Sequence, residues 1–302
     1  MMRTETVTSA QNPKIRNLLL LQEKSRARRE KGLFVVEGRR ELQHCIEAGF
    51  VVRTLFVCPE LAGGDSFASL GRTKGASLGM TKGASLGRTD GTAVGRTVSC
   101  HSEETDGRRE NPLIVEIPEA LYRKVAYRES TEGVIAEVEC RNRTLGQLEL
   151  PEHPLIVVLE SVEKPGNLGA VLRSADAARA DAVIVCDPLT DLWNPNLIRA
   201  SLGGIFTVPT VAASSEETIA WLRARGIRIL TAQLQDSSWY YDVDMTVGTA
   251  LVMGTESTGL TEAWRRAADA HTRIPMLGRL DSLNVSVSAA ILLFEAVRQR
   301  NT

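Results

Sequence analysis

The sequence predicts an α/β protein whose C-terminal half is a parallel sheet with helices on both faces, preceded by a small α/β domain. Two observations predict the parallel sheet. Nearly continuous apolar runs recur after residue 155, and amphipathic segments of helical length separate them. A shorter alternation of the same kind before residue 140 predicts the smaller domain.

The bulk composition is typical of a globular protein. The 302 residues are 43% hydrophobic and carry a net charge of −1, which excludes a uniformly basic nucleic-acid binder but not a local basic patch. Aromatic residues make up only 5%, which argues against base stacking as the main mode of RNA binding. The 5 cysteines and 4 histidines are scattered, so we expect reduced thiols and no metal. No apolar run reaches about 20 residues, and we expect a cytoplasmic protein.

The first segment is basic and has a helical pattern. Apolar residues at Ile15, Leu18, Leu19 and Leu21 predict a buried helix face beneath a basic one. Such a face either contacts RNA phosphates or is merely solvated. The candidate RNA contacts are Lys14, Arg16, Lys24, Arg26, Arg28 and Arg29. The next expected elements are strands at 33–38, 51–57, 113–117 and 133–138 and helices at 39–48 and 119–125.

Residues 63–110 interrupt this domain. Four imperfect eight-residue repeats run from Ala68 to Ser99 and are rich in Gly, Ser and Thr. They bury too little apolar surface to offset their chain entropy, so we expect a disordered insertion without a catalytic role; a β-solenoid is the alternative. The polar stretch 141–154 then predicts a linker. The expected domains are therefore 1–140 and 155–302.

The C-terminal domain is expected to bind its ligand at the carboxyl ends of its strands. The predicted strands are 155–159, 182–186, 206–211, 227–231 and 250–253. The predicted helices are 168–179, 195–202 and 216–225, with a long apolar helix at the end of the chain.

Three motifs combine polar side chains with strand ends. The first, ESVEKPGNLGAVLR at 160–173, is a strand–turn–helix in which Asn167 could cap the helix and Arg173 lies further along it. The second, LVMGTESTGL at 251–260, brings Glu256 to the end of a strand; a helix-start acid is the alternative. The third, IPMLGRLDSLNVSVSA at 274–289, places Ser282 and Asn284 before the last helix, where capping is again the alternative.

Together the motifs resemble the SpoU/TrmH family of SPOUT methyltransferases. The matching pattern is N-x(5)-R, then GTE-x(2)-GL, then IPM followed by SLNVSVSAA, and it covers about 155–300. The segments SAQNPKIRNL and FVVEGRREL are more loosely similar to the RNA substrate-binding domain of a branch that acts on ribosomal RNA.

The resemblance implies a C-terminal trefoil knot whose loops bind S-adenosylmethionine, and a homodimer packed through the knotted domain. That knot is an exception to the usual rule for chain connections. The implied cofactor-binding residues are Gly254, Thr255, Glu256, Ile274, Met276, Leu283 and Asn284. Among these, Gly254, Ile274 and Leu283 are expected to contact the adenine directly.

The implied reaction is methylation of a ribose 2′-hydroxyl in RNA. Arg173 matches the family's essential arginine, for which a general-base role has been suggested; a guanidinium holds its proton firmly, so we favour a clamp on the adjacent phosphate and the developing alkoxide. The implied catalytic residues are Arg173, Asn167, Glu256, Ser282 and Asn284.

There are three alternatives. In the first, the substrate is transfer RNA rather than ribosomal RNA. In the second, the chain is an idle RNA-binding assembly factor, but retention of all five catalytic residues argues against this. A generic nucleotide-binding enzyme would need a phosphate-loop lysine or a ribose-binding acid after a second strand, and neither is evident.

Overall fold

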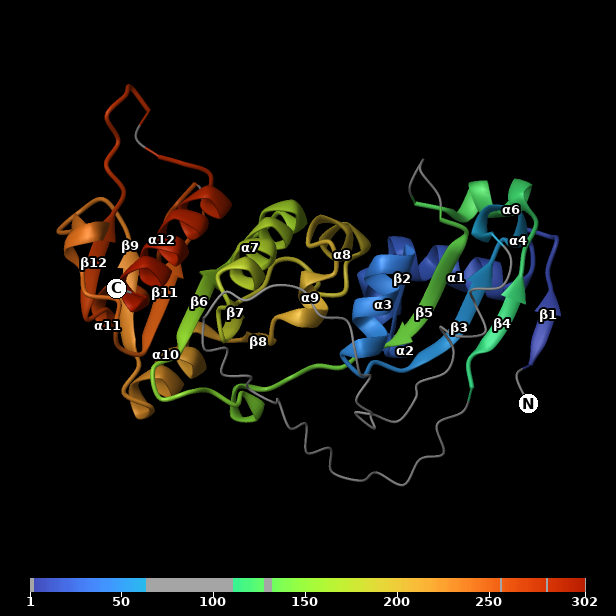
Figure 1. Ribbon diagram of the computed structural model, residues 1–302, viewed down its shortest axis with the longest axis horizontal. Coiled ribbons are helices and arrows are strands. Elements are labelled where there is room, and N and C mark those ends of the chain that lie inside the picture. Colours follow the sequence, from blue (N-terminus) through green and yellow to red (C-terminus); the bar gives the residue numbers. More distant parts are fainter. Residues whose placement is uncertain (1–2, 64–110, 128–131, 256, 281, 302) are drawn as a thin grey trace, which may run out of the picture.

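The computed structural model describes residues 3–63, 111–127, 132–255, 257–280 and 282–301. The repeats from Ala68 to Ser99 therefore lie outside the described residues. The remainder forms two sheets that follow one another along the long axis of the molecule (Figure 1).

The N-terminal sheet is mixed and has the order β1-β4-β3-β5-β2. Its strands are β1 (Thr4–Thr6), β2 (Leu33–Glu37), β3 (Val52–Val57), β4 (Leu113–Glu116) and β5 (Val134–Glu139). Its helices are α1 (Pro13–Glu23), α2 (Ser25–Lys31), α3 (Arg39–Glu47), α4 (Pro59–Ala62) and α6 (Glu119–Val125). Strand β5 is antiparallel to both β2 and β3, whereas β3, β4 and β1 are parallel.

The predicted basic helix is two helices. The extended backbone of Lys24 (φ −110°, ψ 112°) ends α1 and starts α2. The Asn12 side chain caps α1 by accepting a hydrogen bond from the Lys14 amide at 2.9 Å. The predicted apolar face is confirmed, since Ile15, Leu18 and Leu21 are fully buried.

The C-terminal sheet has the order β10-β12-β9-β11-β6-β7-β8, and all its paired strands are parallel. Its strands are β6 (Leu155–Glu160), β7 (Ala182–Cys186), β8 (Thr210–Ala213), β9 (Arg228–Ala232), β10 (Ser238–Trp239), β11 (Thr249–Met253) and β12 (Ala270–Arg273). Its helices are α7 (Pro165–Ala177), α8 (Pro195–Ala200), α9 (Gly204–Thr207), α10 (Ser215–Ala224), α11 (Glu262–Ala267) and α12 (Val285–Arg300), with 3₁₀ turns η1 (Leu145–Gln147) and η2 (Tyr240–Asp242).

Helices cover both faces of this sheet, as predicted. Helices α7 and α12 pack together on one face, and α10 and α11 pack on the other (Figure 1). The predicted fold class, a parallel α/β sheet layered between helices, is confirmed. The strand predicted at 206–211 begins only at Thr210, because Phe206 belongs to the short helix α9.

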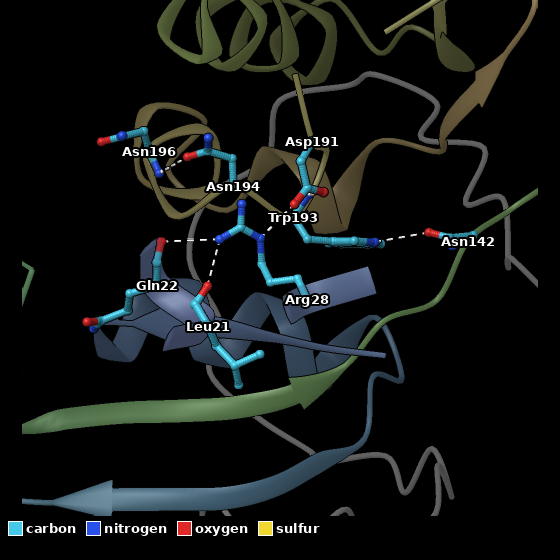
Figure 2. Close-up of polar contacts among 8 residues, drawn as sticks. All are labelled: Leu21, Gln22, Arg28, Asn142, Asp191, Trp193, Asn194 and Asn196. Atoms are coloured by element: carbon cyan, nitrogen blue, oxygen red, sulfur yellow. Dashed lines mark hydrogen bonds and ion pairs between the residues drawn. The ribbon is translucent and has the colours of Figure 1, made fainter. Parts of the chain in front are cut away.

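A buried ion pair joins the two sheets (Figure 2). Arg28 on α2 is only 2% exposed, and its Nε donates to Oδ2 of Asp191 at 2.6 Å. Its Nη1 donates to the carbonyl oxygens of Leu21 at 2.6 Å and Gln22 at 3.2 Å, at the C-terminal end of α1. Because this guanidinium is enclosed by protein, the expectation that Arg28 contacts RNA is corrected: the residue holds the two units together.

Aromatic rings from both units extend this interface. The Trp193 ring stacks on Phe34 with centroids 4.5 Å apart and meets Phe50 edge-on at 5.5 Å. The Trp193 indole donates to Asn142 Oδ1 at 3.0 Å, within the segment predicted as a linker (Figure 2). Leu148 in the same segment is buried against the C-terminal sheet, so 141–154 packs along the domain it precedes.

None of the described helices has the length and apolar character needed to cross a bilayer.

Candidate active site

The seven strands of the C-terminal sheet end at the same edge, because all their pairings are parallel. The first motif directly follows the carboxyl end of β6 at that edge. Helix α7 begins at Pro165 after Lys164, and the Asn167 amide already donates to the Lys164 carbonyl at 3.0 Å. Asn167 therefore does not cap the helix, which corrects the expectation from sequence; proline at the first helical position starts it. Asn167 is half-buried and Arg173 is exposed further along α7.

The third motif meets the first through two amides. Asn284 caps α12, since its Oδ1 accepts from the Ser286 amide at 3.0 Å. Its Nδ2 donates to Oδ1 of Asn167 at 3.1 Å. Capping and motif pairing are therefore roles of the same side chain, and two predicted catalytic residues 117 positions apart are in contact.

The second motif lies beside the first because β11 pairs with β6, with Met253 opposite Leu159. Directly after β11 the chain makes a narrow turn, closed by backbone hydrogen bonds of 3.3 and 3.1 Å between Thr255 and Gly259. A Cβ at Gly254 would stand 2.3 Å from the Gly259 carbonyl, so only glycine fits there. Glu256 lies within this turn but outside the described residues.

Glu160 is a site residue that the sequence reasoning missed. The side chain is 3% exposed at the end of β6, and it accepts hydrogen bonds from the Thr261 amide at 2.8 Å and the Thr261 hydroxyl at 2.7 Å. These bonds attach the start of α11 to β6 and so fix the turn that carries Gly254. The signal was available as an acidic residue that ends the otherwise apolar run LIVVLE.

The segment between β12 and α12 carries the remaining predicted residues. Ile274 and Met276 are half-buried where β12 ends, whereas Ser282 and Leu283 are exposed. Figure 1 shows this segment rising away from the sheet before it returns to α12. The structure thus pairs Asn167 with Asn284 and brings β11 and β12 to the same sheet edge. Convergence of all three turns into one pocket stays a prediction.

Two buried acceptors at this edge lack donors among the described residues. They are Oε1 of Gln233, directly after β9, and Oγ1 of Thr272 in β12. Strand β9 lies between β11 and β12, so Gln233 stands between the second and third motifs. A buried acceptor without a donor is costly unless a ligand supplies one. Nε of Arg273, at the end of β12, is a buried donor that also has no partner among the described residues. The polar groups at this edge therefore fit a ligand that carries both donors and acceptors, as S-adenosylmethionine does.

Metal chemistry has no support in the described part of the chain. No group of three or more His, Cys, Asp or Glu side chains there is arranged to hold an ion. Cys45, Cys58, Cys140 and Cys186 are free thiols, and burial raises the pKa of Cys140 and Cys186 to about 12.

Comparison with known proteins identifies the family. Residues 154–294 match the model of the SpoU rRNA Methylase family, and residues 12–79 match an MRM3-like substrate binding domain. The chain is 36% identical to the 23S rRNA (guanosine-2′-O-)-methyltransferase RlmB of Bordetella pertussis, over 65% of this chain and 81% of that protein. This chain belongs to the SpoU methylase family.

Other relatives agree. The 23S rRNA (uridine(2479)-2′-O)-methyltransferase of Streptomyces viridochromogenes is 34% identical over 61% of this chain and 66% of that protein, just under two thirds of its length. The crystal structure of an AdoMet-bound rRNA methyltransferase from Sinorhizobium meliloti superposes with a TM-score of 0.78 and 28% identity, over 98% of each chain. The predicted family, the enzyme class of RNA methyltransferase and the S-adenosylmethionine cofactor are confirmed.

Proposed function

We propose that the protein methylates a ribose 2′-hydroxyl of ribosomal RNA. One observation carries the proposal: the 3.1 Å hydrogen bond from Asn284 to Asn167 joins two family motifs at the carboxyl edge of the sheet. The relatives described above are named for 23S ribosomal RNA, which favours ribosomal over transfer RNA as the substrate. An idle assembly factor is disfavoured because Asn167, Arg173, Glu256, Ser282 and Asn284 are all retained.

S-adenosylmethionine supplies a methyl group already activated on a sulfonium, so the protein mainly aligns the partners. We propose that the turns at 254–256, 274–276 and 282–284 hold it, with Gln233 and Thr272 as additional acceptors. Gly254 permits the close approach of the backbone at the start of the turn after β11 to the Gly259 carbonyl. Glu160 keeps that turn in register with Asn167 through Thr261.

Arg173 is proposed to act on the RNA. The guanidinium is exposed on α7, between one and two helical turns beyond Asn167. From there it binds the phosphate beside the target ribose and stabilises negative charge as the 2′-oxygen attacks the methyl group. The bound cofactor would supply the methyl group and would leave as the neutral thioether, while the hydroxyl proton would pass to solvent.

The test uses labelled S-adenosylmethionine and unmodified ribosomal RNA, followed by mapping of alkali-resistant linkages. Arg173→Ala should abolish incorporation while calorimetric binding of the cofactor stays close to that of the wild type. The matched control is Arg223→Ala, an exposed arginine on α10 at the opposite face of the sheet. Near-normal methylation by Arg173→Ala would remove the assigned role.

The N-terminal unit is proposed to bind the substrate, as residues 1–140, joined through 141–154 to the methyltransferase domain 155–302. Arg16, Lys24, Arg26 and Arg29 keep exposed cationic side chains, although Arg26 pairs with Glu30 at 2.6 Å. Lys14 is half-buried and pairs with Glu5 at 2.7 Å, which makes it the weakest of these candidates. Because the relatives described above are bacterial, and bacterial ribosomes assemble in the cytoplasm, we propose that the enzyme works there.

We also propose a homodimer packed through the C-terminal domain, with the trefoil knot expected from the family. Exposed apolar side chains gather on α12 and the segment before it: Leu277, Leu280, Leu283, Val287 and Phe294. Val287 and Phe294 are seven residues apart and so share one face of the helix. Phe294→Glu should yield monomers in sedimentation experiments, whereas a wild type that sediments as a monomer would refute the dimer.

A further inference from the structure

The seam between the two units carries a shallow hollow on its surface. Its wall includes Gln22 at the end of α1, Glu37 at the end of β2 and Tyr127 after α6, all from the N-terminal unit. The opposite wall is formed by Pro195, Ile198 and Arg199 of α8. A ligand in this hollow would touch both units at once.

Tyr127 presents a fixed aromatic surface there. The ring is 44% exposed, while its hydroxyl donates to Asn196 Oδ1 at 3.0 Å and its amide donates to Glu37 Oε2 at 2.8 Å. Every other aromatic side chain described before β6 is buried: Phe34, Phe50, Phe56 and Tyr122. The N-terminal unit thus directs its one exposed described ring toward the methyltransferase domain.

Arg199 supplies positive charge beside that ring. The guanidinium carbon lies 5.6 Å from the Tyr127 centroid, and the side chain is exposed. None of the described carboxylates forms an ion pair with it. Glu37 lines the same hollow and accepts from the Tyr127 amide, so the lining includes a cation from α8 and an anion from β2.

The hollow is close to the arginine at the reaction centre. Ala200, which follows Arg199, packs so tightly on α7 that a Cβ at Gly169 would lie 2.5 Å from the Ala200 Cβ. Arg173 is four residues after Gly169, about one helical turn. The two exposed arginines, Arg173 on α7 and Arg199 on α8, therefore lie close to the same helix–helix contact.

We propose that Tyr127 and Arg199 form a second RNA-binding site for an unpaired nucleotide near the target, with its phosphate on Arg199 and its base stacked on Tyr127. This inference rests on the proposed function. A single-stranded nucleotide combines an anionic phosphate with a flat base that has hydrogen-bond donors, which matches a hollow lined by the cation Arg199 and the carboxylate of Glu37. The site holds the strand across the seam while Arg173 acts on the ribose.

The test measures the affinity for unmodified ribosomal RNA transcribed in vitro, over a range of salt concentrations. Tyr127→Leu should weaken binding about tenfold, whereas Tyr127→Phe keeps the stacking ring and should bind like the wild type. Arg199→Gln should weaken binding and reduce the slope of log affinity against log salt by about one phosphate contact. Arg223→Gln on α10 is the control for loss of one exposed charge elsewhere.

Two results would overturn the site: an unchanged salt slope in Arg199→Gln, or equal affinities for Tyr127→Leu and Tyr127→Phe. Melting temperatures close to that of the wild type verify that the variants are folded. The proposed function fails separately, when the wild-type protein does not methylate the RNA at all. If the wild type methylates the RNA and the variants bind it normally, only the proposal for this second site is refuted.

Discussion

The Nε atom of Arg28 lies 2.6 Å from Oδ2 of Asp191, and the two side chains are only 3% and 12% exposed. This ion pair spans 163 positions of sequence and links α2 to the segment that follows β7. Asp191 also accepts from the Trp193 amide at 3.0 Å, so one carboxylate orders both the charged and the aromatic part of the interface.

Arg28→Met should lower the free energy of unfolding by about 3–5 kcal/mol, because it leaves Asp191 buried without its counter-charge. The double variant Arg28→Met/Asp191→Leu should regain most of that loss, since apolar side chains of similar volume need no desolvated partner. Urea titrations measure both. Arg26→Met is the control, because the Arg26–Glu30 pair is exposed and should contribute less than about 1 kcal/mol. A single Arg28 variant as stable as the control would contradict the role of this pair.

Asn284 offers a way to separate capping from contact between motifs. Asn284→Asp keeps the acceptor for the Ser286 amide but loses the donor to Asn167 and sets two oxygens against each other. We expect stability near the wild type and a marked fall in methylation rate. Asn284→Ala removes both interactions and should also cost about 1 kcal/mol of stability. Thermal melts and single-turnover assays distinguish the two; full activity in Asn284→Asp would make the Asn167 contact irrelevant to catalysis.

Gly254→Ala should weaken S-adenosylmethionine binding by at least about tenfold. The added methyl group would lie 2.3 Å from the Gly259 carbonyl and force the 255–259 turn open. Gly166→Ala is the matched control, because nothing lies within 4 Å of a Cβ at this helical position. The control should bind the cofactor normally and gain a few tenths to about 1 kcal/mol in stability. Calorimetry with the cofactor measures the difference, and equal affinities would show that the turn is dispensable.

The buried carboxyl of Glu137 should make the stability of the protein depend on pH. Burial raises the pKa of this carboxyl on β5, against the opposing effects of hydrogen bonds from Asn17 and Thr54. A folded pKa above the unfolded value means that the folded protein holds the proton more tightly, so stability falls as pH rises through the interval between the two values.

Glu137→Gln removes the buried charge and keeps an acceptor for the Asn17 amide, whose present distance to Glu137 is 2.8 Å. The variant should be more stable than the wild type at about pH 7, and the gap should close at about pH 3, where the wild-type carboxyl is protonated in both states. A pH-independent difference would point to altered packing instead.

The elements that the sequence predicts best are those with a strong local pattern. Strands β6, β7 and β11 are buried along their whole length, and their nearly continuous apolar sequence predicts buried strands. Strand β12 has the polar sequence Ala270–Arg273 and was missed, because its neighbour β10 is only two residues long and little of its surface needs apolar cover. The expectation of a disordered insertion at the repeats 68–99 stays a prediction, since these residues lie outside the described ones.

The site shows where local rules stop. A capping rule identified Asn284 correctly but chose Asn167 for α7, where Pro165 had already started the helix. The pairing of these two amides depends on the packing of α7 against α12, which no window of sequence contains. Arg28 is the clearest case, because its basic neighbours indicate a solvated face while its burial is decided by Asp191 in the other unit.

The interlocked rings of Phe34, Phe50 and Trp193 constrain how this enzyme can be recombined. A chimera that receives its first 140 residues from a relative without equivalents of Phe34, Phe50 and Arg28 would leave Trp193 facing foreign side chains and Asp191 without a cation. New target preference is therefore more accessible through substitutions at solvent-facing positions than through exchange of whole modules. Grafts that carry residues equivalent to Phe34, Phe50 and Arg28 together should express as folded protein far more often than grafts that do not.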